Sequence, residues 1–539
     1  MNDDTSPEIV QQLADPVRDG LARGWKVIDA SSPGRDLTLE TDIAIVGTGA
    51  GGGIAAEILA DAGLRVLMIE EGPLKSSTDF RMREADAYRD LYQESAARKT
   101  ADKAINILQG RCVGGGTTVN WTSSFRTPAP TLAHWQSTHG WSRDGAADLA
   151  PWFDRVEARL GIAPWLIAPN ANNAALARGA ATLGIHHDVI RRNVRGCWNL
   201  GYCGMGCPTN AKQSMLVTTI PHALDAGATL VTRARANRYV VRGDDIESLE
   251  CVAMDATGTT PTTRRITVRA RTFVTAAGAI GSPALLLRSG VPDPYATIGV
   301  RTFLHPTVVS AALMPARVDG FAGAPQTIYS DQFMGAVLDG PIGFKLEAPP
   351  VHPVLAAITL PGHGTQHAAW MRRLPNMQVL IALLRDGFHA DSIGGRVRLA
   401  GDGTPLLDYP LTPYIFDGIR RALVAMAEVQ FAAGATSVMP VHDEGNGYAA
   451  LGTARAAIAA FDLRPRATTV VSAHVMGGCA LGADPRHAVV DETGKHHHLA
   501  NLYVLDGSLF PTSVGANPQL SIYALTTKLA TSLAQRLRT

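Results

Sequence analysis

Hydrophobic and polar positions follow a regular pattern in three stretches of the chain and lose it in a fourth. Between residues 43 and 69, two short apolar runs flank a helical pattern, which predicts strand, helix and strand. Residues 227–283 combine β-branched runs with alternation and end in a strand, a small-residue turn and a helix. Residues 465–539 are again strongly patterned, whereas 311–464 is apolar but irregular. The strands predicted in the second stretch are 229–232, 238–241, 248–252 and 263–274.

A glycine-rich turn joins the first predicted strand to the helix after it. Gly47, Gly49 and Gly52 give the spacing G-x-G-x-x-G, in which the first glycine permits the tight turn. The second lets the backbone approach a pyrophosphate, and the third lets helix and strand pack closely. Glu70 follows the second strand, where a carboxylate can hold a ribose diol. This unit predicts an adenine-dinucleotide site, with the helix N-terminus facing the phosphates.

Length and composition limit the other possibilities. A chain of 539 residues exceeds a single simple core, so two or more domains are expected. Its 49 basic and 48 acidic residues leave a net charge of +1, which gives no support for nucleic acid or an anionic membrane as a partner. No apolar run reaches transmembrane length. The acidic N-terminal segment has no signal-peptide pattern, so a cytoplasmic location is expected, with periplasmic export alongside a partner left open.

Four separated motifs resemble those of the glucose–methanol–choline (GMC) family of flavin oxidoreductases. The first is the dinucleotide unit, and the second is GRCVGGGTTVNW, starting at Gly110. The third, AAGAIGSPALLLRSG, contains Gly278, Gly281, Ser282 and Pro283. The fourth is the C-terminal pair of HVMGGCALG, starting at His474, and DGSLFPTSVGANPQLSIYAL, starting at Asp506. The resemblance covers most of 41–310 and 465–539, and its cysteine and catalytic residues are nearest to cholesterol oxidases, long-chain alcohol oxidases and FAD-dependent glucose dehydrogenases.

This resemblance implies an α/β protein with a Rossmann-like FAD-binding domain and a discontinuous α+β substrate domain, whose antiparallel sheet is covered by helices. The FAD-binding domain is expected to be discontinuous as well. The predicted division is an N-terminal extension at 1–40, an FAD-binding domain at 41–130, 210–310 and 465–539, a connecting region with a cysteine loop at 131–209, and a substrate domain at 311–464.

The resemblance also implies which residues bind the cofactor. Some members attach FAD through a histidine in the second motif, but Val119 stands at that position here, so FAD is expected to bind non-covalently. Asp506 is expected to accept a hydrogen bond near the flavin, or else to cap a helix. The predicted FAD-binding residues are Gly47, Gly49, Gly52, Glu70, Gly110, Arg111, Gly114, Gly115, Thr117, Asn120, Ala277, Gly278, Asp506, Gly507 and Pro518.

Two C-terminal residues match the family's catalytic positions. Oxidation of an alcohol removes a hydride and a hydroxyl proton, and a histidine near neutrality can serve as the base. The resemblance places His474 in that role. It pairs His474 with Asn517, whose amide can orient the hydroxyl and stabilise negative charge that develops on its oxygen. The predicted reaction is hydride transfer from an alcohol to flavin N5.

Three cysteines form a second candidate site. Cys197, Cys203 and Cys207 give the spacing C-x5-C-x3-C-P on a glycine-rich loop, which suits a [3Fe–4S] cluster. The spacing resembles the cluster loop of FAD-dependent glucose dehydrogenases that work with a cytochrome. It partly resembles long-chain alcohol oxidases too, in which the C-x3-C element precedes a Lys-Gln pair, here Lys212 and Gln213. A compact loop with inert thiols is the equal alternative.

Substrate and electron acceptor are less well defined by the sequence. Leu, Met, Pro, Ile and Ala dominate 333–388, which favours a lipophilic alcohol over a sugar, although such residues also build domain cores. Oxygen, a quinone or a cytochrome could reoxidise the flavin, and a small partner subunit is possible. One alternative is a cluster-containing sugar or polyol dehydrogenase subunit that passes electrons to a cytochrome. Another is a flavoprotein subunit whose main task is electron relay.

Overall fold

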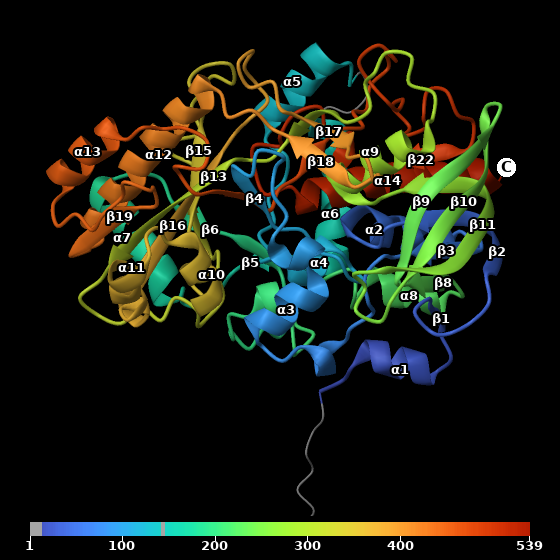
Figure 1. Ribbon diagram of the computed structural model, residues 1–539, viewed down its shortest axis with the longest axis horizontal. Helices are drawn as coiled ribbons and strands as arrows, with labels where there is room; N and C mark the ends of the chain where they lie inside the picture. Colours follow the sequence, from blue (N-terminus) through green and yellow to red (C-terminus); the bar gives the residue numbers. More distant parts are fainter. Residues whose placement is uncertain (1–12, 142–145, 539) are drawn as a thin grey trace, which may run out of the picture.

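Two eight-stranded sheets organise the protein in a computed structural model, which describes residues 13–141 and 146–538 (Figure 1). The first sheet has the order β1-β8-β3-β2-β11-β10-β9, and β22 pairs with β11. Pairing is parallel from β1 to β11 and with β22, and antiparallel among β9, β10 and β11. The strands are β1 (Lys26–Asp29), β2 (Leu37–Val46), β3 (Val66–Ile69), β8 (Thr229–Thr232), β9 (Ala234–Arg242), β10 (Asp245–Met254), β11 (Pro261–Thr275) and β22 (Leu502–Val504).

The second sheet is antiparallel except where β20 pairs with β4. Its order is β4-β20-β13-β16-β15-β14-β6, and β19 pairs with β13. The strands are β4 (Ile105–Ile107), β6 (Asp188–Val189), β13 (Thr307–Leu313), β14 (Ile328–Ser330), β15 (Phe344–Glu347), β16 (Met377–Leu384), β19 (Ser437–Pro440) and β20 (Val470–Ser472). Smaller sheets are formed by β12 (Val300–Phe303), β17 (Gly395–Leu399), β18 (Pro405–Asp408) and β21 (Met476–Gly477), and by β5 (Ile162–Pro164) with β7 (Arg191–Asn193).

Helices cover both sheets (Figure 1). The helices α7 and α12 pack on one face of the second sheet, and α2 packs against α8 and α14 beside the first. The helices of the described residues are α1 (Pro16–Ala22), α2 (Ala50–Asp61), α3 (Glu84–Leu91), α4 (Gly116–Val119), α5 (Ala129–His139), α6 (Ala146–Leu160), α7 (Ala171–Leu183), α8 (Thr219–Asp225), α9 (Gly278–Ser289), α10 (Pro353–Thr359), α11 (Gly364–Met371), α12 (Pro413–Ala432), α13 (Leu451–Ala460) and α14 (Gln519–Arg538).

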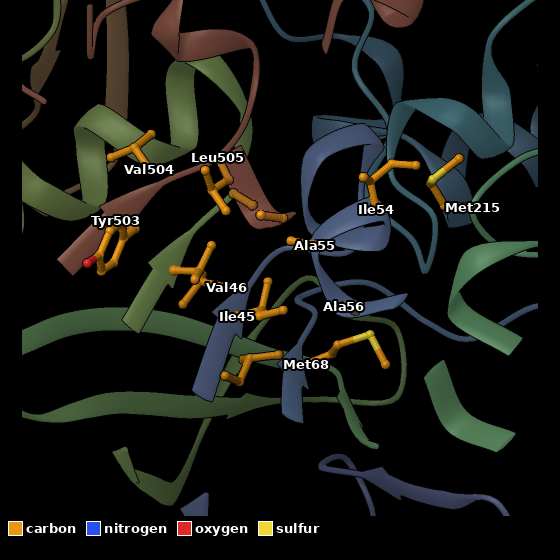
Figure 2. Packing of buried hydrophobic residues seen from close by; sticks show 14 of the residues in the cluster. Ile45, Val46, Ile54, Ala55, Ala56, Met68, Met215, Tyr503, Val504 and Leu505 are labelled. Carbon is orange, nitrogen blue, oxygen red and sulfur yellow. The ribbon is translucent and has the colours of Figure 1, made fainter. Parts of the chain in front are cut away.

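The core of the first sheet is built where α2 crosses the strands on either side of the glycine turn. Figure 2 shows Ile45 and Val46 of β2 and Met68 of β3 packing near Ala55 and the C-terminal segment at Leu505. All five side chains are buried. Small residues on α2 let the helix lie close to the sheet, and burial of each large apolar side chain contributes about 1.5–3 kcal/mol. This packing fixes the turn from which the cofactor site starts.

The predicted fold class is confirmed: a Rossmann-like sheet and an antiparallel, helix-covered sheet are both present. The strand–helix–strand unit predicted between 43 and 69 is found as β2, α2 and β3, and all four strands predicted between 229 and 274 are present.

The predicted N-terminal extension at 1–40 is only partly separate from the first sheet in the structure. Helix α1 lies within the predicted extension, and residues 1–12 lie outside the described residues. Residues 26–40 do not form a separate extension, because β1 pairs with β8 and β2 already begins at Leu37. Within residues 13–141 and 146–538, no helix combines the length and apolar character needed to cross a bilayer.

Candidate functional site

A cavity of about 740 Å³ extends between the two sheets. At one end it is lined by the glycine turn after β2 and by the start of α2, and at the other by β13, β16 and α10. His474 and Asn517 also line it. Of the predicted FAD-binding residues, all but Gly52 and Gly114 contribute to the wall. The volume falls in the range typical of cofactor and ligand sites.

The dinucleotide end of the cavity depends on glycines. Gly47 has φ +95°, a conformation that L side chains rarely adopt. A Cβ on Gly52 would lie 1.9 Å from the Gly47 carbonyl oxygen, so helix and turn can only pack this closely without side chains. Gly49 and Gly115 approach each other across the cavity wall, where a Cβ on Gly115 would lie 2.8 Å from the Gly49 Cα. By contrast, a Cβ on Gly116 would meet no atom within 4 Å, so this backbone faces open space. Such a backbone-lined trough fits a dinucleotide cofactor.

Two buried carboxylates, Glu70 and Asp506, each accept hydrogen bonds from separate segments of the chain at this end of the cavity. Glu70 Oε2 accepts hydrogen bonds from the Thr48 hydroxyl at 2.6 Å and amide at 3.2 Å, and Oε1 accepts from the Gly72 amide at 2.9 Å. Burial raises the pKa of Glu70, and these hydrogen bonds oppose that shift. The Glu70 oxygens therefore already have partners within the chain, while the residue still lines the cavity.

Asp506 connects two of the predicted motifs. It caps a short 3₁₀ turn by accepting from the Ser508 amide at 2.8 Å. Its other oxygen accepts from the Gly278 amide at 2.8 Å and the Ser282 hydroxyl at 2.6 Å. One side chain thus caps the 3₁₀ turn and also accepts a backbone hydrogen bond from Gly278.

The second motif, residues 110–121, forms the cofactor loop, which is held by hydrogen bonds to several parts of the chain. The Thr117 hydroxyl donates to the Gly114 carbonyl at 2.6 Å, and Asn120 Nδ2 donates to Gln519 Oε1 at 2.6 Å. Arg111 donates to the carbonyl of Gly258. Val119 lines the cavity, and non-covalent binding of FAD stays a prediction. The loop is rigidly placed on the cavity wall by partners from distant parts of the chain.

The predicted catalytic pair lies in a buried polar network that also contains residues not identified from the sequence. His305 Nδ1 is 3.3 Å from His474 Nδ1, and Asn517 Nδ2 donates to Glu347 Oε2 at 3.3 Å. Burial lowers the pKa of His474 to about 3, with a smaller contribution from nearby Lys345. Both histidines are therefore neutral imidazoles in the structure.

Two buried ionisable residues, Lys345 and Glu347, lie near Asn517. They lie two residues apart on β15, so their side chains are on the same face of the strand. Burial lowers the pKa of Lys345 to about 8 and raises that of Glu347 to about 7. The ammonium nitrogen of Lys345 lies 3.4 Å from the ring centre of Phe125, within cation–π range. Charged residues at alternate positions of an otherwise apolar strand, GFKLEA, are the signal in the sequence for this pair.

The three cysteines do not form the predicted cluster site. In the part of the chain that the structure describes, no three His, Cys, Asp or Glu side chains are arranged to hold a metal ion. Each sulfur instead accepts a hydrogen bond: Cys197 from the Asn199 amide at 3.4 Å, Cys203 from Arg192 at 3.6 Å, and Cys207 from the Lys212 amide at 3.5 Å. None of these three cysteines forms a disulfide. None lines the cavity, so the structure favours the alternative of a compact loop.

The cysteine loop is attached to the cofactor loop by Lys212. This buried ammonium donates to the carbonyls of Thr118, Asn120 and Cys203, the last two at 3.1 and 2.7 Å. Burial lowers the pKa of Lys212 to about 8. Lys212, noted in the sequence only as part of a Lys-Gln pair, therefore has a structural role in placing the cofactor loop.

The far end of the cavity is lined by one face of the second sheet. Val309 and Ala311 of β13 pair with Ile381 and Val379 of β16, and all four side chains belong to one apolar cluster with α10. The intervening residues face the opposite side and pack against α7 and α12. Val379 and Ile381 keep 8% and 7% of their surface exposed, whereas Leu380 between them has none, which shows that the cavity lies over the first set. This wall carries no charge.

Comparison with known proteins defines the class of this protein. Two sequence profiles of the GMC oxidoreductases match residues 88–307 and 391–526. An uncharacterised GMC-type oxidoreductase of Mycobacterium tuberculosis is 31% identical over 519 residues, covering 93% of this chain and 78% of its own length. The chain belongs to the GMC oxidoreductase family, whose members are flavoproteins, and the resemblance seen in its motifs is confirmed.

Individual relatives add detail. A long-chain-alcohol oxidase of Arabidopsis thaliana, FAO4B, is 29% identical over 525 residues, covering 92% of this chain and 68% of the relative. Among solved structures, pyridoxine 4-oxidase from Mesorbium loti matches with a TM-score of 0.66 at 20% identity, covering 91% of this chain and 99% of that one. A substituted formate oxidase of Aspergillus oryzae matches with a TM-score of 0.67 at 15% identity, covering 94% and 100%. These structures support the fold.

Proposed function

We propose that the protein oxidises a lipophilic alcohol to an aldehyde or ketone, with non-covalently bound FAD as hydride acceptor. The observation that carries the proposal is the composition of the cavity: a glycine-lined trough at one end, an uncharged apolar wall at the other, and His474 and Asn517 on its lining. Oxidation of alcohols agrees with membership of the family and with similarity to long-chain-alcohol oxidases of Arabidopsis thaliana.

The residues of the trough fit FAD. Gly47, Gly49 and Gly115 would hold the pyrophosphate side through the backbone, and Glu70 stands where the sequence motif predicts a ribose contact. FAD, when bound, supplies the flavin that accepts the hydride. The chain itself orients the alcohol and excludes water from its carbon.

The apolar wall favours an elongated, lipophilic substrate. From Thr307 to Ala311 the exposed face of β13 extends four residues, or about 13 Å at the usual rise per strand residue. The facing residues of β16 add only apolar side chains along this length, and α10 adds Leu355 and Ala356 together with one hydroxyl, that of Thr359. A sugar would leave its hydroxyl groups without partners on such a wall, and unpaired buried polar groups are costly. An alkyl chain, by contrast, gains free energy from the same contacts.

His474 and Asn517 are proposed to bind the hydroxyl at the reacting carbon, and His474 remains the predicted base. The test is the replacement His474→Ala in the FAD-loaded protein, with the exposed His487→Ala as a matched control. Anaerobic addition of a medium-chain alcohol should bleach the flavin absorbance in wild type and control. Loss of the His474 imidazole should slow bleaching by about 10²–10⁴-fold while FAD stays bound. Bleaching at the wild-type rate in His474→Ala would overturn the proposed role.

A further inference from the structure

Gln326 is a buried polar side chain on the cavity lining that the proposed reaction does not use. Only 4% of its surface is exposed. Its backbone amide donates to the carbonyl of Ala348 at 3.0 Å, which places it beside the end of β15. Glu347, the residue before Ala348, pairs with Ile381 of the apolar wall. Gln326 therefore lies next to that wall, where a buried polar group needs a hydrogen-bond partner.

The orientation of the Gln326 amide follows from its contact with Ser123. The Ser123 hydroxyl donates to Gln326 Oε1 at 2.8 Å and has no other partner among the described residues. If the amide were turned round, the hydroxyl hydrogen of Ser123 and the amide oxygen would both lack partners, although both side chains are buried. The amide oxygen therefore faces Ser123, and the amide nitrogen points away from it.

The amide nitrogen of Gln326 is a donor without an acceptor. It carries two hydrogens, and no residue that the structure describes accepts either of them. Nε2 is not fully enclosed by protein, in contrast to Asn517 Oδ1, which is. Because the side chain lines the cavity and is otherwise buried, the surface that Nε2 keeps opens onto the cavity. A bound substrate can therefore reach this donor.

The backbone that carries Gln326 is held in place by a buried arginine. Gln326 has φ +48° and Thr122 has φ +69°, in the left-handed region that non-glycine residues rarely adopt. The Arg192 guanidinium donates to the Pro325 carbonyl and the Thr122 hydroxyl, both at 2.7 Å, and to the Trp121 carbonyl at 3.1 Å. Residues in such conformations cluster at ligand-binding positions. Arg192 thus fixes Gln326 relative to the cofactor loop.

We propose that Gln326 is a specificity-determining residue, whose amide nitrogen donates a hydrogen bond to a second oxygen of the substrate, apart from the hydroxyl group that is oxidised. This inference deepens the proposed function and rests on it. The side chain of Gln326 is not part of the polar network around His474 and Asn517, whose roles stay as proposed. The favoured substrate is then a mainly apolar alcohol with one ether, carbonyl or further hydroxyl oxygen along its chain. A plain alkanol would cover the amide N–H without pairing it, which lowers affinity.

The test compares wild type with Gln326→Met, which keeps the length of the side chain and removes the donor. The probes are decanol and its isosteres in which an ether oxygen replaces one methylene at a time. For at least one position, the second-order rate of anaerobic flavin bleaching relative to decanol should be about 3–10-fold higher in wild type than in Gln326→Met. The control Gln366→Met, at an exposed position on α11, should match wild type.

Two outcomes would overturn the inference. The same relative rates in Gln326→Met and wild type for every isostere would show that the amide does not select an oxygen. Equal slowing of all the alcohols, decanol included, would show that Gln326 serves the reacting hydroxyl instead. Ser123→Ala keeps the glutamine but frees its amide to rotate, so it should lose part of the preference while its FAD content equals that of wild type.

Binding without turnover separates this inference from the proposed function. Methyl-capped versions of the same probes have no hydroxyl to oxidise, and their binding is read from the shift of the flavin absorbance. The affinity ratio between the best isostere and the capped decanol should again be about 3–10-fold larger in wild type than in Gln326→Met. If no alcohol bleaches the flavin, the proposed function fails, and equal affinity ratios in the two proteins would independently refute the role of Gln326.

Discussion

The two ends of the cavity are built by opposite means. The dinucleotide end is made of backbone. Its key residues are Gly47, Gly52 and Gly115, at which a Cβ would collide with a neighbouring backbone segment; Gly47 and Gly115 also have positive φ. The substrate end is made of side chains: an apolar wall aligned by the register of β13 and β16, and a polar network around His474 and Asn517. Backbone sites tolerate almost no substitution but need few partners, whereas side-chain sites can be altered one group at a time. The two ends should therefore respond very differently to mutation.

The largest effect is expected at the dinucleotide end. In Gly52→Ala the new Cβ would lie 1.9 Å from the Gly47 carbonyl oxygen, and neither backbone segment can move without distorting the turn. We expect a loss of about 3 kcal/mol or more in the free energy of unfolding, together with loss of the flavin absorbance. Denaturant unfolding and the visible spectrum measure both. The control Gly452→Ala adds a methyl group with no atom within 4 Å, and should retain wild-type stability and FAD. Full FAD content in Gly52→Ala would contradict the backbone argument.

An intermediate effect is expected on the apolar wall. Ile381→Ser places a hydroxyl over the substrate path, and should lower kcat/KM for a long-chain alcohol about 10–100-fold through lost apolar contact. FAD binding should be unchanged, because Ile381 is far along the wall from the glycine trough. The matched control is Val354→Ser on α10, an apolar residue with 42% exposure. A similar loss with short and long alcohols would argue that the wall does not contact the alkyl chain.

The last effect appears only at acid pH and concerns stability. The pKa of His474 is about 3 in the folded protein and near 6.5 when unfolded, so between these values the unfolded state binds more protons. Stability contributed by this group is therefore present above pH 6.5 and is lost as the pH falls toward 3. Replacement by Asn should flatten the fall of unfolding free energy with pH by up to about 1.4 kcal/mol per pH unit. Parallel curves for wild type and His474→Asn would show that His474 titrates normally in the fold.

The difference between the end built from backbone and the end built from side chains also explains which parts of the site could be predicted from the sequence. The glycine turn, α2 and β3 are adjacent in the chain, so their spacing alone indicated the dinucleotide site and the fold around it. His474 and Asn517 were found through family motifs rather than through any pattern of their own.

His305, Lys345 and Glu347 could not be found in this way. Their proximity arises from pairing of β13, β15 and β16, in which Thr307 and Lys345 both face Leu383. Register of this kind depends on the whole sheet and leaves no local spacing in the sequence. The cysteine loop shows the reverse problem, since its spacing suggested a metal site that the folded backbone does not bring together.

The cofactor loop also sets an order for assembly. Its partners are made long after it: Lys212 follows Thr118 by 94 residues, and Gln519 follows Asn120 by 399. A chain emerging from the ribosome therefore cannot close this loop when its first strand–helix–strand unit folds. If the loop must be closed to retain the cofactor, we expect nascent chains and C-terminally truncated products that lack Gln519 to be free of flavin. The flavin absorbance of a purified sample would then indicate that synthesis has reached the start of α14.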